Sequence, residues 1–166
     1  MGTRFRQIFE DDEFLPSINN AKWRTYAACL SDLVIFTSAT AGIENGLSDR
    51  EITDLARYCF ETAVRQTFDD AEAGKMRDEI AARFDKRISS VVWHDAAAGE
   101  KAFTSSPLEL INSAPIAEEF KQLDKEIVTN SIRFRWRDVR EQLLNRIERE
   151  AICADWRSIQ RLPVVN

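Results

Sequence analysis

The side chains best suited to catalysis or metal binding are one histidine and three cysteines. His94 lies beside Asp95 and could act as a general base, and together with Cys29, Cys59 and Cys153 it would complete a four-ligand zinc site. Zinc ligands, however, usually occur in closely spaced pairs, and no two of these four residues are paired in that way. Lone cysteines on apolar helix faces behave as small hydrophobic residues. The pattern therefore predicts no metal site, no cofactor and no catalytic residue.

Sequence motifs of the common enzyme classes are also missing. The five glycines form neither a GxGxxG nor a GK[ST] loop, and no serine lies in a GxSxG motif. A carboxylate-bridged di-metal bundle needs two Glu-x-x-His pairs, which a single histidine cannot supply. The sequence leaves enzymatic activity open and favours a protein that acts by binding.

The arginine-rich stretch SIRFRWRDV, residues 131–139, has two interpretations. As a strand it would present an apolar face and an arginine face suited to phosphate contacts. As a helix it belongs to a longer series, in which apolar residues recur every three to five positions at Ile116, Phe120, Leu123, Ile127, Ile132, Trp136, Val139, Leu143, Ile147 and Ala151. A strand accounts for three apolar residues and a helix for all ten, so the pattern predicts a helix.

On that helix the arginines border the apolar series instead of forming one exposed face. Arg133, Arg137 and Arg140 lie on one side and Arg135 on the other. Arginine stems in such positions cover apolar surface while the charged ends pair with acids. The chain has a net charge of −5, yet residues 130–166 contain eight arginines, no lysine and five acids, so the remaining residues carry −8 and can supply those acids.

The position of these residues predicts a protein contact. We expect Trp136, Val139, Leu143 and Ile147 to form a seam that packs on a protein partner or on a second copy of the chain. The alternative is a regulator that binds nucleic acid through the arginine-rich segment 133–149, with contacts from Arg133, Arg135, Arg137 and Arg140.

Capping signals place the other helices. An apolar helix is expected after Ser17, Asn19 or Asn20, ending at Gly42 or Gly46. Further helices are expected over 51–64, where Ser48 and Glu51 form a capping box, from Asp69 or Asp70 to Val91, and from Ser106 to the residue before Pro115. The stretch 91–106 is expected to be a long loop or to hold a short strand.

The sequence thus predicts a mainly α, single domain over 1–166, a bundle of five to six helices. The C-terminal helix would be long or broken near 129–131, because a continuous helix over 116–160 would measure about 67 Å, against about 40 Å for a globule of this size. Unpaired cysteines and the lack of an N-terminal apolar run predict a cytoplasmic protein. The most apolar stretch, YAACLSDLVIF, is interrupted by Asp32 and is expected to be too short to span a membrane.

Overall fold

A computed structural model of the chain describes residues 14–67, 74–99 and 101–161, and these residues form helices and no strands. Helices account for 83% of this part of the chain. They are α2 (Phe14–Glu44), α3 (Asp49–Thr67), α4 (Gly74–Ile88), α5 (Trp93–Ala97), α6 (Ser105–Ser113), α7 (Glu118–Leu144) and α8 (Arg149–Gln160). The predicted mainly α class and the helical state of residues 131–139 are confirmed.

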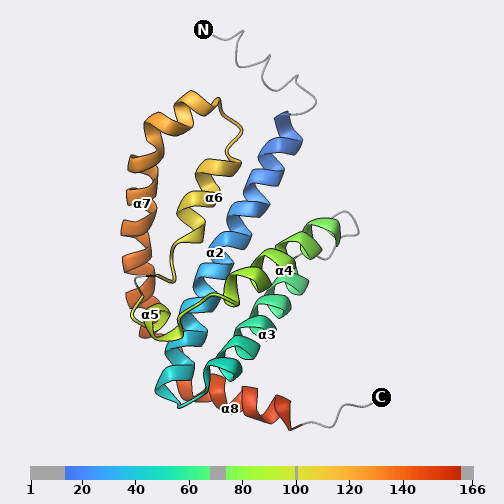
Figure 1. Cartoon of the computed structure of the whole chain (residues 1–166), viewed down its shortest axis with the longest axis vertical. Coiled ribbons are helices and arrows are strands. Elements are labelled where there is room, and N and C mark those ends of the chain that lie inside the picture. The colour runs from blue at the N-terminus through green and yellow to red at the C-terminus, as the bar shows by residue number, and fades with distance from the viewer. Residues whose placement is uncertain (1–13, 68–73, 100, 162–166) are drawn as a thin grey trace.

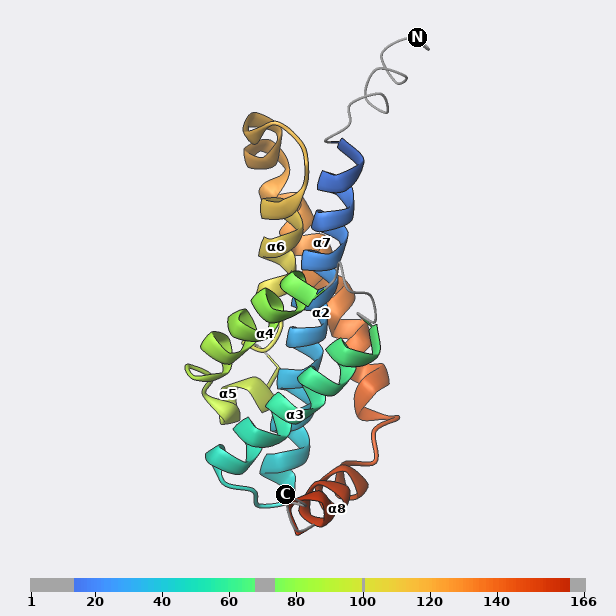
Figure 2. The ribbon, with the colours of Figure 1, turned by 90° about the vertical axis from the view of Figure 1, so that its right-hand side faces the viewer.

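The apolar helix α2 lies at the centre of the molecule and contacts α3, α4, α5, α6 and α8 (Figures 1 and 2). By length and composition α2 could cross a membrane, because the helix extends well beyond the short stretch YAACLSDLVIF on which the expectation is based. In this fold, however, 67% of its most apolar window is buried inside the protein. Because α2 packs on helices on several sides, its apolar residues form the core of the bundle.

The turn from α2 to α3 brings two backbones close together. Gly42, expected to end the helix, lies inside α2, where a Cβ atom would overlap the side chain of Ile52 on α3. The turn itself is at Gly46, whose φ of 68° is a conformation that glycine adopts without strain. Ser48 and Glu51 then form the predicted capping box, in which the Ser48 amide and hydroxyl donate to the Glu51 carboxylate at 2.8 and 2.7 Å.

Helices α3 and α4 pack through aromatic rings, and the segment after α4, expected to be a loop or a strand, contains a short helix. The rings of Phe60 and Phe84 stack with centroids 3.8 Å apart. The expected start of α4 at Asp69 or Asp70 lies outside the described residues. The stretch expected to be a loop or strand contains the short helix α5, which is fixed by Trp93, a buried residue whose indole N–H donates to Thr53 at 3.2 Å.

The sequence predicts a C-terminal helical region that is one long helix or breaks near 129–131, and the structure places the break elsewhere. Helix α7 continues through 129–131, where Thr129 is buried, and it ends instead at Leu144. In a straight helix, successive residues are rotated by about 100°, so Trp156 would point about 160° away from Trp136. The turn over 145–148 lets α8 pack Cys153 and Trp156 into the same core. This turn and α5 raise the helix count of the described residues to seven, above the five to six predicted.

Candidate functional site

Helix α7 carries apolar residues on two opposite faces. The sequence series takes one step of five residues, from Ile127 to Ile132, and in an unbroken helix this step rotates the series by about 140°. The two halves of the series therefore point in opposite directions. We call the residues after the step the inner stripe (Ile132, Trp136, Val139 and Leu143) and those on the other face the outer stripe (Phe120, Leu123, Ile127 and Phe134).

The inner stripe is used by the chain's own fold. Trp136 is buried, its ring lies 4.6 Å from that of Phe103, and its indole N–H donates to Ser106 at 2.8 Å. The other three residues of the inner stripe are partly buried against the same core. Three of the four predicted partner-binding residues, Trp136, Val139 and Leu143, belong to this stripe, whereas Ile147 lies in the turn before α8 and is partly exposed. Their role in partner binding stays a prediction.

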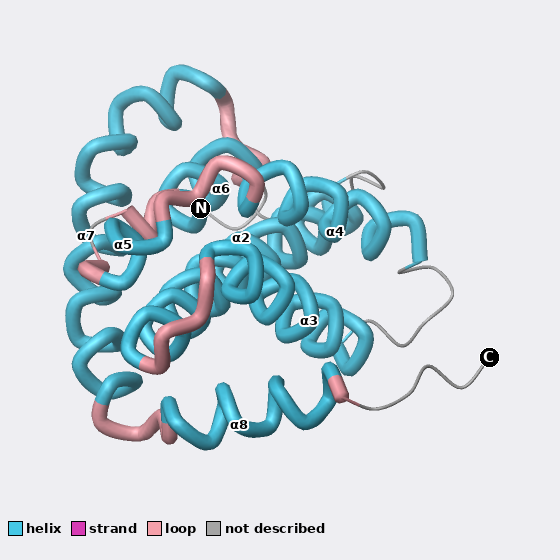
Figure 3. Tube along the Cα trace, turned by 60° about the horizontal axis from the view of Figure 1, so that its bottom comes forward, coloured by secondary structure: helices cyan, strands magenta, loops and turns pink. Residues whose placement is uncertain are grey.

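The outer stripe is exposed to solvent. Its side chains are 52% (Phe120), 73% (Leu123), 68% (Ile127) and 58% (Phe134) exposed. Helix α7 lies along one edge of the molecule, with α6 and α2 on the same side of it (Figures 1 and 3). Four large apolar side chains are thus exposed on one face over about 21 Å of helix, and exposed apolar surface of this extent is typical of interaction surfaces.

The four predicted nucleic-acid-binding arginines are on α7, but they do not form a single basic face. Arg133, Arg135 and Arg137 are exposed, whereas Arg140 is partly buried and lies over the ring of Phe103. Arg137 lies over the ring of Phe134, 4.6 Å from its centroid. Within the described residues none of the four pairs with an acid, contrary to the expectation that acids of the body neutralise them.

The acidic side chains of α7 are concentrated in its N-terminal half. Glu119, Asp124 and Glu126 are exposed and, in the part of the chain that the structure describes, make no ion pair. Glu118 pairs with Lys121 at 2.8 Å. The outer stripe thus runs from an acidic half of the helix into an arginine-rich half, with charges on both flanks that the fold leaves unpaired.

A second polar region surrounds Asp32 of α2, whose carboxylate is fully buried. It accepts hydrogen bonds from the amides of Ser105 and Ser106 at 3.2 and 2.9 Å and from the Ser106 hydroxyl at 2.6 Å. Arg87 of α4 pairs with it at 2.6 Å and also donates to Ser31 at 2.6 Å and to the carbonyl of Ala102 at 2.7 Å. Since Trp136 donates to Ser106, this network joins α2, α4, α6 and α7.

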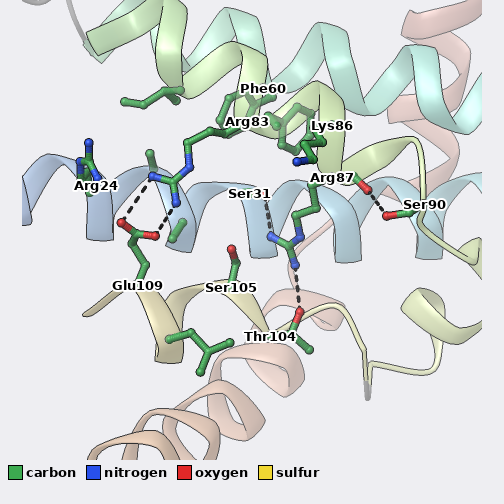
Figure 4. A pocket seen from close by; sticks show the side chains of 15 residues that line it. Arg24, Ser31, Phe60, Arg83, Lys86, Arg87, Ser90, Thr104, Ser105 and Glu109 are labelled. Atoms are coloured by element: carbon green, nitrogen blue, oxygen red, sulfur yellow. Dashed lines mark hydrogen bonds and ion pairs between the residues drawn. The ribbon is translucent and has the colours of Figure 1, made fainter. Parts of the chain in front are cut away.

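The Asp32 network borders a pocket of about 550 Å³ between α2, α4 and α6, shown in Figure 4. Four cationic side chains line it, and three are engaged: Arg24 with Glu79, Arg83 with Glu109, and Arg87 with Asp32. Figure 4 shows Arg83 and Glu109 pointing toward each other across the opening, and this hydrogen bond raises the pKa of Arg83. Because three of these four cations are already paired with carboxylates, the pocket is poorly suited to holding an anion.

A second pocket, of about 350 Å³, lies between α2, α6 and α7 and is almost wholly apolar. Cys29, Arg135 and Trp136 are among the residues that line it. Burial, reinforced by the nearby Asp32 carboxylate, raises the pKa of the Cys29 thiol. Such a thiol is protonated at neutral pH and is a poor nucleophile, so the pocket holds no group prepared for covalent chemistry.

The residues first considered for metal or acid–base chemistry are not brought together. His94 is exposed on α5, whereas Cys153 is buried with its thiol 3.4 Å from the carbonyl of Ala41. Burial raises the pKa values of the Cys59 and Cys153 thiols as well. Among the described residues no three His, Cys, Asp or Glu side chains are arranged to bind a metal ion.

Sequence reasoning missed both the outer stripe and the Asp32 network, although each has a sequence signal. The signal for the outer stripe is the five-residue step between Ile127 and Ile132. The signal for the network is Asp32 itself, a single carboxylate in the most apolar stretch of the chain. A charge in such a place must be paired when it is buried, which predicts a partner such as Arg87.

Comparison with known proteins gives no further information on the site, because no family model, curated protein or solved structure matches the chain.

Proposed function

We propose that this protein is a helical protein–protein interaction module, with a regulatory or accessory role, and that its contact surface is the outer stripe of α7. The observation that carries the proposal is the exposure of Phe120, Leu123, Ile127 and Phe134 on one face of the continuous helix α7. The inner stripe and the Asp32 network hold α7 against the body of the molecule, so the outer stripe is already formed in the unbound protein. Pre-formed contact surfaces reduce the ordering cost of binding.

The pockets, the cysteines and the burial of α2 are also consistent with a protein that acts by binding another protein. Three of the four cations in the first pocket are paired with carboxylates, the second pocket has apolar walls, and burial raises the pKa of its Cys29 thiol instead of activating it. A cytoplasmic location is part of the proposal and is supported by the three free cysteines. We include no membrane contact, because α2, the helix of membrane-spanning length in the described residues, is largely buried against its neighbours.

Nucleic-acid binding is the second candidate, favoured by the exposed and unpaired Arg133, Arg135 and Arg137. Against it, these side chains are divided between the two flanks of an apolar stripe, and the chain as a whole is acidic. A binding titration with generic duplex DNA and RNA at about 50 and 200 mM salt separates the candidates, since a contact with 6–10 phosphates loses about 10³–10⁵ in affinity over this interval. We expect no binding at either salt concentration.

Site-specific photo-crosslinking in the native cell tests the interaction surface directly. Benzoylphenylalanine in place of Leu123 should give protein adducts, while the same group in place of Leu108, an exposed leucine of α6 that lines the pocket between α2, α4 and α6, should not. Adducts at position 123 to protein, whether to the same chain or to another, support the proposal. Adducts to nucleic acid, or equal labelling at both positions, contradict it.

A further inference from the structure

The charges that flank the outer stripe identify a partner of particular chemistry. Residues 118–127 hold four acids and two lysines, and residues 133–140 hold four arginines and one acid, so the net charge changes from −2 to +3 along the helix. A partner helix lying along the stripe must therefore be basic opposite the first half and acidic opposite the second. Helix α7 of a second copy, running in the opposite direction, has this pattern.

The geometry points to an antiparallel homodimer in which the outer stripes of two α7 helices pack against each other. This inference rests on the proposed function and names the partner that the outer stripe binds. The stripe residues are separated by three, four and seven positions, which is the spacing of two-helix seams. Asn130, which is exposed, occupies the remaining seam position between Ile127 and Phe134.

The residue spacing also gives the register of the pair. With the two-fold axis beside the midpoint of Ile127 and Asn130, Leu123 lies opposite Phe134 of the second copy, and Ile127 lies opposite Asn130. The flanking residues Glu126 and Arg133 then oppose each other across the seam, once on each side of the axis. Both are exposed and, in the described part of the chain, without an ion pair inside the fold, so both are free to form this contact.

A parallel arrangement of the same two helices is disfavoured by charge. It would place the acidic halves together and the arginine-rich halves together, with Glu119 near Asp124 of the second copy. Like charges held side by side at an interface cost free energy and oppose that pairing. The antiparallel arrangement instead places the acidic half of each helix beside the arginine-rich half of the other and repeats the Glu126–Arg133 contact twice, as a two-fold interface requires.

Molar mass of the purified full-length chain, measured by sedimentation from about 1 to 100 μM, tests the inference because self-association follows mass action. We expect a transition from the chain mass to twice the chain mass. Leu123→Glu should weaken the association at least about 30-fold, the effect of losing a central interface residue. Leu108→Glu, a change of the same kind on an exposed α6 leucine, should leave the association unchanged.

Charge exchange tests the direction of the helices. Glu126→Arg and Arg133→Glu should each weaken self-association about 10-fold, and the double variant should return to within about threefold of the original chain, because the exchanged charges again oppose each other. A double variant weaker than either single variant would overturn the antiparallel arrangement. Circular dichroism of each variant should show the helix content of the original chain, and loss of helix would assign the weakening to misfolding and count against the inference.

The failure of this inference differs from the failure of the proposed function. A chain that stays monomeric at the highest concentration, yet is photo-crosslinked at position 123 to a different protein, overturns the homodimer and leaves the interaction surface intact. A dimer that survives Leu123→Glu shows that the copies meet through another face, which also overturns the inference. Absence of protein adducts at position 123 overturns the proposed function itself.

Discussion

The buried carboxylate of Asp32 and the guanidinium of Arg87 form an ion pair, 2.6 Å long, that connects the central helix α2 to α4. The pair is also hydrogen-bonded on all sides: Asp32 accepts from the first turn of α6, and Arg87 donates to Ser31 and to the carbonyl of Ala102. Within the described residues every buried side-chain nitrogen and oxygen has a hydrogen-bond partner. One charged residue in the core thus determines how three helices meet.

Removing one member of this pair should destabilise the protein strongly. Asp32→Ala leaves Arg87 largely buried without its carboxylate and removes the acceptor for the α6 amides. We expect the free energy of unfolding to fall by about 3–5 kcal/mol, the range for breaking a buried pair. Urea denaturation followed by circular dichroism measures the change. A loss below about 1 kcal/mol, the usual range for an exposed pair, would contradict the structural role assigned to Asp32.

The pair between Arg24 and Glu79 supplies the matched control. It joins the same helices, α2 and α4, at 3.0 Å, but 35% of the Arg24 side chain and 51% of the Glu79 side chain are exposed. Glu79→Ala should therefore cost only about 0–1 kcal/mol. The contrast between the two substitutions shows whether burial, and not the mere presence of an ion pair, determines the contribution.

The contact between Gly42 and Ile52 predicts a non-additive pair of substitutions. A Cβ atom at position 42 would overlap Ile52, so Gly42→Ala should destabilise the fold by about 1–3 kcal/mol despite alanine's higher helix propensity. Ile52→Ala removes the atoms that clash but opens a cavity costing about 2–5 kcal/mol. The double variant should be more stable than the sum of the two losses predicts. Additive losses in a double-mutant cycle would mean that the helices separate instead of packing closely here.

The capping box of α3 predicts a dependence of stability on pH. Hydrogen bonds from the Ser48 hydroxyl and amide lower the pKa of Glu51. A carboxylate with a lowered pKa contributes stability that is fully present above its ordinary pKa, about 4.3, and lost as pH falls through the lowered value. Glu51→Gln should therefore lower the midpoint of urea unfolding at neutral pH and have little effect in strong acid.

Removal of the hydroxyl partner is the control for this pH effect. In a Ser48→Ala background, Glu51→Gln should change the neutral-pH midpoint less, because one of the two hydrogen bonds to the carboxylate is gone. An equal effect in both backgrounds would assign the pH dependence to another interaction of Glu51, such as that with Arg157.

Local signals in the sequence predicted much of the fold, whereas the functional surface depends on helix continuity. The capping box at Ser48 and Glu51 is decided by neighbouring residues, so it could be predicted from them alone. The continuity of the helix through Thr129–Ser131 could not be predicted in this way, because these residue types weaken helices. Tertiary packing keeps the helix continuous there, and Thr129 is buried. That continuity reverses the direction in which Leu123 and Ile127 point, so a break at 129–131 and an outer stripe are mutually exclusive.

Two aromatic residues only two positions apart on α7 test the two faces of this helix directly. Trp136 is buried and donates a hydrogen bond to Ser106, while Phe134 is 58% exposed. Trp136→Ala should reduce the free energy of unfolding by about 3–5 kcal/mol, as for other large aromatic residues removed from a core. Phe134→Ala should change it by no more than about 0.5 kcal/mol when measured well below the concentration at which the chain self-associates.

The same pair of variants should show the opposite order in self-association. Phe134→Ala removes a ring from the outer stripe and should weaken the dimer, whereas any Trp136 variant that stays folded should not. Trp136→Phe keeps an aromatic ring in the core and loses only the hydrogen bond to Ser106, so it provides a folded comparison. Sedimentation of Phe134→Ala and Trp136→Phe at matched concentrations measures the difference. Equal dimerisation by both variants would show that the outer face of α7 is not the contact between copies.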